Sequence, residues 1–270
     1  MTLKGGVMRT EEEVKADIDK LYEKDLIGMS SSEIEHWDNE LRTLEKELDG
    51  IKKTKETEKE NSPEAVAERN RKRIERQEKN LIESGIGKRF QNVTINSYEC
   101  NTPEQKNVLS IIKQFITNPY GKSLLMLGNP GNGKTMLCAI ICRYLGAKYI
   151  KSSELKDELD YARSFNAKMN PSEVIKKYAK IPVLIVDEVG AYQSPGECEY
   201  LFRLLNERYE EELPTVFVSN LSKEDFAKYV GKLILDRLSE TCKSIVFNWD
   251  SYRPNHKDKW SGYINSELFE

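Results

Sequence analysis

Residues 123–145 read SLLMLGNPGNGKTMLCAIICRYL and combine an apolar run, a glycine-rich segment and a helix-forming run. The central GNPGNGKT, Gly128–Thr135, matches the pattern G-x-x-x-x-G-K-[ST] of a phosphate-binding loop. Glycines let backbone N–H groups wrap closely around a phosphate, and the N-terminus of the following helix adds partial positive charge. The alternative is a chance glycine-rich turn, which the strand-like and helix-like flanks disfavour. This stretch therefore predicts a strand, a phosphate-binding loop and a helix.

Two side chains of this loop have separate predicted roles. We expect Lys134 to reach the β- and γ-phosphates and the hydroxyl of Thr135 to hold Mg²⁺. The predicted ligands are therefore ATP and Mg²⁺. The predicted nucleotide contacts are Gly128, Asn129, Pro130, Gly131, Asn132, Gly133, Lys134, Thr135 and Met136.

A second motif, IPVLIVDEVG at 181–190, predicts a buried strand with two acidic residues at its carboxyl end. Open α/β sheets bind ligands at that end of their strands. We expect Asp187 to contact Mg²⁺, directly or through water, and Glu188 to polarise the attacking water. A third strand, PTVFVSN, ends in Asn220, which suits a sensor of the γ-phosphate or the water. An asparagine that merely begins a turn is the alternative.

Strands and helices alternate through the second part of the chain. The strand candidates are 123–127, 147–151, 183–186, 214–219 and 244–247. The helix candidates include 135–145, 153–165, 195–211 and 223–229. Short, continuously apolar strands that alternate with helices predict an α/β fold with a parallel sheet covered on both faces.

The first 60 residues predict a hairpin of two antiparallel helices. Thr10 with Glu13, and Ser30 with Glu33, form capping boxes at the two helix starts. Met29 and Ile34 occupy the positions of a hydrophobic staple. Apolar residues then recur at spacings of three and four, which indicates a narrow seam. They are Ile34, Trp37, Leu41, Leu44, Leu48 and Ile51.

This hairpin is acidic, because residues 1–60 hold 11 Lys and Arg against 17 Asp and Glu, a net charge of −6. Such a surface is a poor DNA binder and suits docking to a protein. The alternatives are a hairpin packed only on itself and a homodimeric coiled coil. A polar helix should follow and end near Gly85. We therefore expect a docking hairpin at 1–60, a helical linker at 61–85 and an ATPase domain at 86–270.

Composition narrows the class of protein further. The five cysteines form no Cys-x-x-Cys pair and only two histidines occur, so a structural zinc site is not expected. Scattered thiols suit a reducing compartment. No apolar run approaches the length of a membrane span, and the N-terminus lacks the apolar core of a signal peptide. We expect a cytoplasmic protein with no membrane contact.

The three motifs together resemble those of the AAA+ ATPases, which have a five-stranded parallel sheet. Two more stretches, ESGIGKRF at 83–90 and LILDRLSETCKSIVFNWDSYRP at 233–254, are similar to the DnaC-type replicative helicase loaders. The resemblance implies that Arg237 is an arginine finger for a neighbouring subunit's ATP and that Arg253 senses the γ-phosphate in its own subunit. A planar guanidinium suits both roles, and a surface salt bridge is the alternative for each. The family often carries a basic residue where this chain has Leu233.

The same resemblance implies a function, namely ATP-dependent loading of a hexameric DnaB-type replicative helicase onto single-stranded DNA during replication. The ATP state would control binding of single-stranded DNA, and hydrolysis would drive release. Subunits would associate through their ATP sites. The family's DNA contacts correspond to 164–168 and 192–196, where Phe165 and Tyr192 suit base stacking. Either aromatic could instead be a core or rim residue.

Two other functions stay open. IstB-type transposition helpers share the ATPase core and the DSYR ending, although the tryptophan of NWDSYR and the acidic front end favour the loader. A nucleotide-switched adaptor that binds ATP and scarcely hydrolyses it is the third possibility. The presence of Glu188 argues against that adaptor.

Overall fold

The computed structural model describes residues 9–23, 30–193 and 196–252. The chain divides into two compact units, residues 1–74 and 75–270, and the division falls inside helix α3 (Pro63–Glu83). Each unit is described by itself below. Within the described ranges, no helix is both long and apolar enough to cross a membrane.

The first unit contains an antiparallel hairpin of α1 (Glu11–Tyr22) and α2 (Ser31–Glu60). Both predicted capping boxes are present. The indole of Trp37 donates a hydrogen bond to the carbonyl of Leu21 (2.9 Å), and Arg9 pairs with Glu47 (3.3 Å). The start of α1 therefore lies beside the middle of α2, and the end of α1 lies near the start of α2.

A small apolar core holds the two helices together. Its buried members are Val14 and Ile18 of α1 with Leu41 and Leu44 of α2. Partly buried Leu21, Trp37, Leu48 and Ile51 pack against them. The predicted seam is thus confirmed from Trp37 to Ile51. It is wrong at Ile34, which is 41% exposed, because α1 reaches only as far as Trp37. The other member of the predicted staple, Met29, lies outside the described residues.

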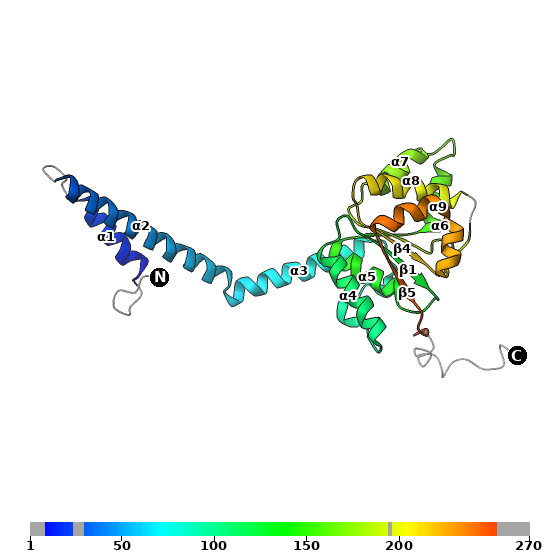
Figure 1. Cartoon of the computed structure of the whole chain (residues 1–270), viewed down its shortest axis with the longest axis horizontal. Helices are drawn as coiled ribbons and strands as arrows, with labels where there is room; N and C mark the ends of the chain where they lie inside the picture. Colours follow the sequence, from blue (N-terminus) through cyan, green and yellow to red (C-terminus); the bar gives the residue numbers. More distant parts are fainter. Residues whose placement is uncertain (1–8, 24–29, 194–195, 253–270) are drawn as a thin grey trace. The chain divides into compact units, whose positions relative to one another are not determined.

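Five parallel strands form the sheet of the second unit, in the order β2-β3-β4-β1-β5. Figure 1 labels three neighbours among them, β4, β1 and β5. They are β1 (Ser123–Gly128), β2 (Lys148–Lys151), β3 (Leu184–Asp187), β4 (Thr215–Ser219) and β5 (Cys242–Phe247). All five predicted strands are confirmed, and so is the predicted α/β class with a five-stranded parallel sheet. Because the strands are parallel, the carboxyl ends of β1, β3 and β4 meet at one edge of the sheet.

Helices cover both faces of this sheet. Leu124 and Met126 of β1 pack in a core with α4 (Pro103–Thr117) and α5 (Lys134–Leu145). Leu125 and Leu127 point to the other face, where the core includes α6 (Ser152–Tyr161), α7 (Pro171–Ala179), α8 (Glu197–Glu210) and α9 (Lys223–Thr241). This alternation follows from the two-residue period of a strand. Two short 3₁₀ helices, η1 (Lys88–Phe90) and η2 (Ile95–Ser97), precede α4.

Two of the predicted helices end elsewhere. The helix predicted at 153–165 ends at Tyr161, after which the backbone forms turns, including one closed from Ser164 N to Tyr161 O (2.9 Å). The helix predicted at 223–229 continues to Thr241 as α9. Gly231 interrupts α9 with a φ of 75°, and a second helical stretch follows the interruption.

Candidate active site at the carboxyl edge of the sheet

The predicted phosphate-binding loop joins β1 to α5 and depends on glycine at two crowded positions. Gly128 has a φ of 124°, and a Cβ there would lie 2.2 Å from the carbonyl oxygen of Phe247. At Gly133, with a φ of 90°, a Cβ would lie 2.9 Å from the ring of Tyr98. Only glycine combines such φ values with so little space. The neighbouring chain therefore fixes the shape of the loop.

Lys134 begins α5 and turns its side chain back into the loop. Its Nζ donates hydrogen bonds to the carbonyl oxygens of Gly128 and Asn129, the latter at 2.8 Å. The amine is thus held within the curve of the loop, at the N-terminus of a helix. Both features favour an anion at this place.

Thr135 and Asp187 come from different motifs and lie together. The hydroxyl of Thr135 donates to Asp187 Oδ2 (3.3 Å), as does the hydroxyl of Tyr149 (2.7 Å), while the Glu188 N–H donates to Oδ1 (2.7 Å). Burial raises the pKa of Asp187 above its ordinary value, and the hydrogen bond from Tyr149 opposes that rise. Asp187 is therefore a desolvated carboxyl group beside the loop.

These oxygens suit a magnesium ion. Mg²⁺ prefers hard oxygen ligands and usually takes only one or two from the protein, with phosphates and water completing the shell. Thr135 and Asp187 supply two such oxygens 3.3 Å apart. Within the described ranges, no group of three or more His, Cys, Asp or Glu is arranged to hold a metal ion by itself. The residues present fit an ion that is shared with a phosphate ligand.

Glu188 follows Asp187 in a strained backbone conformation, with a φ of 60°. A positive φ disfavours a residue that carries a Cβ by about 1–2 kcal/mol. Hydrogen bonds around the turn hold it, including Val189 N to Val218 O (2.9 Å) and Gly190 N to Glu197 Oε1 (3.2 Å). Such strain at the end of a strand is typical of functional sites.

The carboxylate of Glu188 is paired with Lys151, the last residue of β2. The Lys151 Nζ lies 3.0 Å from Glu188 Oε1, and this hydrogen bond raises the pKa of Lys151. Asn220 lies on the same edge of the sheet, directly after β4, and is exposed. Since β4 lies between β1 and β3, Asn220 follows the strand that separates the two motifs. The edge thus brings together Lys134, Thr135, Asp187, Glu188 and Asn220.

Some contacts of this site were not foreseen from the sequence. The side-chain amide of Asn132 donates to the carbonyl of Trp249, and the Trp249 indole donates back to the Asn132 carbonyl (3.2 Å). The Tyr252 N–H donates to the Gly131 carbonyl (3.0 Å). Trp249 and Tyr252 therefore hold the phosphate-binding loop through hydrogen bonds to its backbone and to Asn132. Both residues belong to the string NWDSYR, which supported the family resemblance, but no pattern in the sequence predicted that they contact the loop.

Glu197 was also missed, because an acidic residue in the first turn of a helix is ordinary. It is buried, and it accepts hydrogen bonds from the hydroxyls of Ser152 and Tyr229 as well as from Gly190 N. It thus joins the turn after β3 to the start of α6 and to α9. No pattern in the sequence signals this convergence.

The remaining predicted site residues lie elsewhere. Arg237 is in the last part of α9, close to the start of β5, and therefore at the amino edge of the sheet. Arg253 lies outside the described residues, as do residues 194 and 195 of the predicted DNA-contact loop. Phe165 and Tyr192 are 103% and 71% exposed, which removes the core alternative for both. Leu233, on α9 with Arg237, is also exposed.

A family model described as IstB-like ATP binding protein matches residues 52–260. This span includes the whole sheet and every site residue named above. No curated protein matches the chain significantly.

Several solved structures share a fold with this chain. The structure of DnaI is 22% identical with a TM-score of 0.53, and the match covers 65% of this chain and 98% of that chain. The structure of the DnaC helicase loader is 23% identical with a TM-score of 0.54, covering 60% of this chain and 100% of that chain. The structure of the replication initiator DnaA bound to AMPPCP and single-stranded DNA is 13% identical with a TM-score of 0.52. That match covers 68% of this chain and 59% of that chain. At these identities the likeness establishes the fold.

Proposed function

Because the chain belongs to the family of IstB-like ATP binding proteins and is an ATPase of the AAA+ class, we propose that it loads a replicative helicase onto DNA. The helicase would be a hexameric DnaB-type ring, and the DNA would be single-stranded. The observation that carries this proposal is the match to the DnaC helicase loader, which extends over 100% of that chain. The acidic hairpin adds support, since it offers a second, separate unit for a protein partner.

The ATP site would work through the residues at the carboxyl edge. The loop from Gly128 to Met136 binds the nucleotide, with Lys134 on the β- and γ-phosphates. Thr135 and Asp187 would hold Mg²⁺, which neutralises phosphate charge when bound. Glu188 orients the attacking water, and the nearby Asn220 contacts the γ-phosphate or that water. Arg253 senses the γ-phosphate in the same subunit.

Arg237 would complete the site of a neighbouring subunit. The six residues of β1 span about 20 Å between the two edges of the sheet. A side chain at the amino edge therefore does not reach the loop of its own subunit. This separation supports self-association through the ATP sites, with Arg237 acting in trans.

Mixing of variants tests this arrangement. Arg237→Ala should keep ATP affinity and lose DNA-stimulated hydrolysis, because only the neighbour's site is deprived of a cation. Mixing it with Lys134→Ala should partly restore activity, since Lys134→Ala subunits still offer an intact Arg237. If no mixture is ever active, the trans-acting assignment is wrong.

The chain's parts would divide the task. Residues 1–60 dock onto the helicase, 61–85 form a helical linker, and 86–270 hold the ATPase domain. Exposed Phe165 and Tyr192 would stack on bases of single-stranded DNA. Deleting residues 1–60 should abolish co-purification with a DnaB-type helicase while ATP binding persists. Retained co-purification would move the docking surface to the ATPase domain.

An IstB-type transposition helper is the second candidate, because the matching family model is described as IstB-like ATP binding protein. The two candidates differ in the protein they bind. The purified chain should capture a purified DnaB-type helicase if it is a loader and a purified transposase if it is a transposition helper. Repeating the capture with and without ATP shows whether the nucleotide controls the contact.

A further inference from the structure

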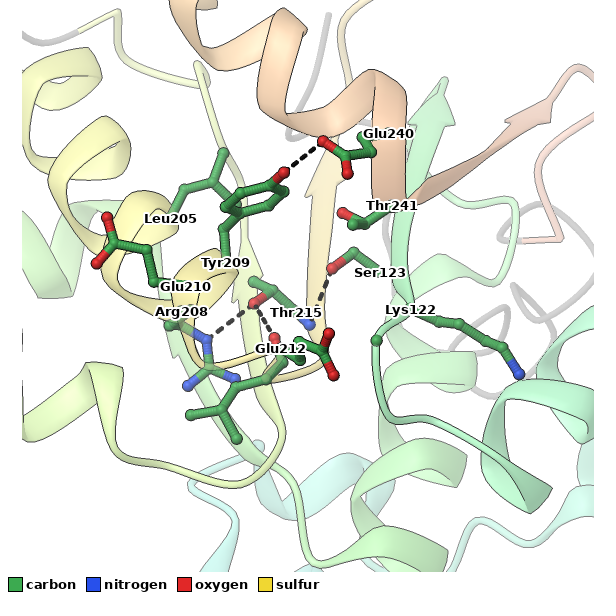
Figure 2. Close-up of a pocket in the computed structure, with 12 residues that line it drawn as sticks. Lys122, Ser123, Leu205, Arg208, Tyr209, Glu210, Glu212, Thr215, Glu240 and Thr241 are labelled. Carbon is green, nitrogen blue, oxygen red and sulfur yellow. Dashed lines mark hydrogen bonds between the residues drawn. The ribbon is translucent and has the colours of Figure 1, made fainter.

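A pocket of about 280 Å³ opens at the amino edge of the sheet, between the ends of α8 and α9 and the starts of β1 and β4 (Figure 2). Tyr209 near the end of α8 and Glu240 on α9 both line it. The hydroxyl of Tyr209 donates a hydrogen bond to Glu240, as the dashed line in Figure 2 marks. This hydrogen bond to the Glu240 carboxylate raises the pKa of Tyr209.

The ring of Tyr209 also faces Arg237. The guanidinium carbon lies 4.9 Å from the ring centre, within the range of a cation–π contact. Arg237 and Glu240 are three residues apart and therefore neighbours on one face of α9. One tyrosine thus contacts both side chains on that face.

The backbone that carries Tyr209 is itself anchored. Arg208, fully buried, donates hydrogen bonds to the carbonyls of Tyr178 (3.1 Å), Ala179 (3.0 Å), Ile181 (2.6 Å) and Pro214 (2.6 Å). A fifth hydrogen bond joins its Nε to the Thr215 hydroxyl (2.8 Å). The last turn of α8 is thereby tied to the end of α7 and the start of β4, so Tyr209 projects from a fixed point.

We propose that Tyr209 is a positioning residue that aims Arg237 at the ATP of a neighbouring subunit. A cation–π contact engages one side of the guanidinium, which carries five N–H donors, so donors stay available for phosphate oxygens. Glu240 orients the ring by accepting a hydrogen bond from its hydroxyl, and Arg208 anchors the turn of α8 that carries Tyr209. Support of this kind, from residues that do not touch the substrate, sets the geometry of the group that does. The inference rests on the trans-acting role proposed above for Arg237.

The test compares ATP hydrolysis by purified full-length chains in the presence of single-stranded DNA. Tyr209→Leu removes the ring, Tyr209→Phe keeps the ring without the hydroxyl, and Tyr120→Leu is a control at an exposed tyrosine. Tyr209→Leu should lower the rate by about 2- to 30-fold, the range expected for one cation–π contact. Tyr209→Phe should lower it less, and Tyr120→Leu should match the wild type. ATP affinity should be the same in all of them.

Mixing separates positioning from misfolding. Tyr209→Leu subunits have an intact ATP site, so added Lys134→Ala subunits should restore their hydrolysis by supplying a well-placed Arg237. A loss that no mixture restores would overturn the inference, and so would a rate equal to or above that of the wild type. An increase would mean that Tyr209 sequesters Arg237. If Arg237→Ala hydrolyses ATP at the wild-type rate, the proposal that Arg237 is an arginine finger fails. If Arg237→Ala is impaired and Tyr209→Leu is not, the finger proposal stands and only the positioning role of Tyr209 fails.

Discussion

Asp187 and Arg208 are buried charges at opposite edges of one sheet, and their surroundings differ in kind. Asp187, 5% exposed, lies at the carboxyl edge, and Arg208, 0% exposed, lies near the amino edge. Burial is the largest cause that raises the pKa of Asp187, and it lowers the pKa of Arg208 to about 10. Both groups are therefore disfavoured in their charged forms by loss of water.

The protein groups that compensate for this loss of water differ between the two residues. Four carbonyls and one hydroxyl surround Arg208, and two of those carbonyls, of Tyr178 and Ala179, end α7. The negative end of a helix dipole thus faces the cation. Asp187 accepts hydrogen bonds from two hydroxyls and one N–H, and its pKa remains raised. Arg208 thus has hydrogen-bond acceptors from the protein on all sides, while Asp187 lies beside the phosphate-binding loop, where the proposed Mg²⁺ would add a positive charge. We therefore expect a structural role for Arg208 and a role in ligand binding for Asp187.

Among substitutions that test this difference, we expect the largest effect from replacing Arg208. Arg208→Leu should lower the free energy of unfolding by about 3 kcal/mol or more, because buried carbonyls lose their donors. Arg203→Leu, on the same helix, should change it by less than about 1 kcal/mol, since Arg203 makes one exposed hydrogen bond, to Ser172. Urea denaturation of the nucleotide-free chain measures both. Equal values for the two variants would contradict a structural role for Arg208.

At the carboxyl edge of the sheet, substitution of Glu188 should reduce ATP hydrolysis and not stability. Glu188→Gln should slow ATP hydrolysis by about 10²- to 10³-fold and leave ATP binding intact, because the water loses its orienting carboxylate. Glu199→Gln, an exposed site in the first turn of α8, should hydrolyse ATP at the wild-type rate. Steady-state hydrolysis with separate binding measurements checks this. Equal rates for wild type and Glu188→Gln would remove Glu188 from catalysis.

The smallest expected effect is a gain in stability at Asp187. Its folded pKa lies above the ordinary 3.8, so the folded state binds more protons than the unfolded state above that pH. Stability contributed by this group is therefore complete below pH 3.8 and falls as pH rises through the folded pKa. Asp187→Asn removes the penalty and should stabilise the nucleotide-free chain at pH 7 by on the order of 1 kcal/mol.

The pH dependence of the stability gained by Asp187→Asn tests its cause more directly than the gain at pH 7 does. The stability difference between Asp187→Asn and wild type should shrink as the pH falls toward 3.8. Asp157→Asn, at an exposed position, serves as the control. A gain at Asp187 that stays constant with pH would mean that desolvation of the carboxylate is not its cause.

Much of the fold followed from local patterns. The strands came from apolar runs, and the capping boxes at Thr10 and Ser30 correctly placed the starts of α1 and α2. The ends of helices were harder. The break at Gly231 and the end of α6 at Tyr161 depend on turns that the apolar pattern does not encode.

The sequence by itself determined the strand order along the chain and the residues of the phosphate-binding loop, because short-range spacing fixes both. It also placed Asp187 and Glu188 at a strand end. Only the tertiary structure decided which distant groups meet at this edge of the sheet. They include Asn132 and Trp249, which exchange hydrogen bonds, and Glu188 and Lys151, which form an ion pair. The cation–π contact between Arg237 and Tyr209 was likewise decided only by the tertiary structure. Such contacts join residues far apart in the chain, and their geometry is set by the packing of strands and helices, which no local pattern records.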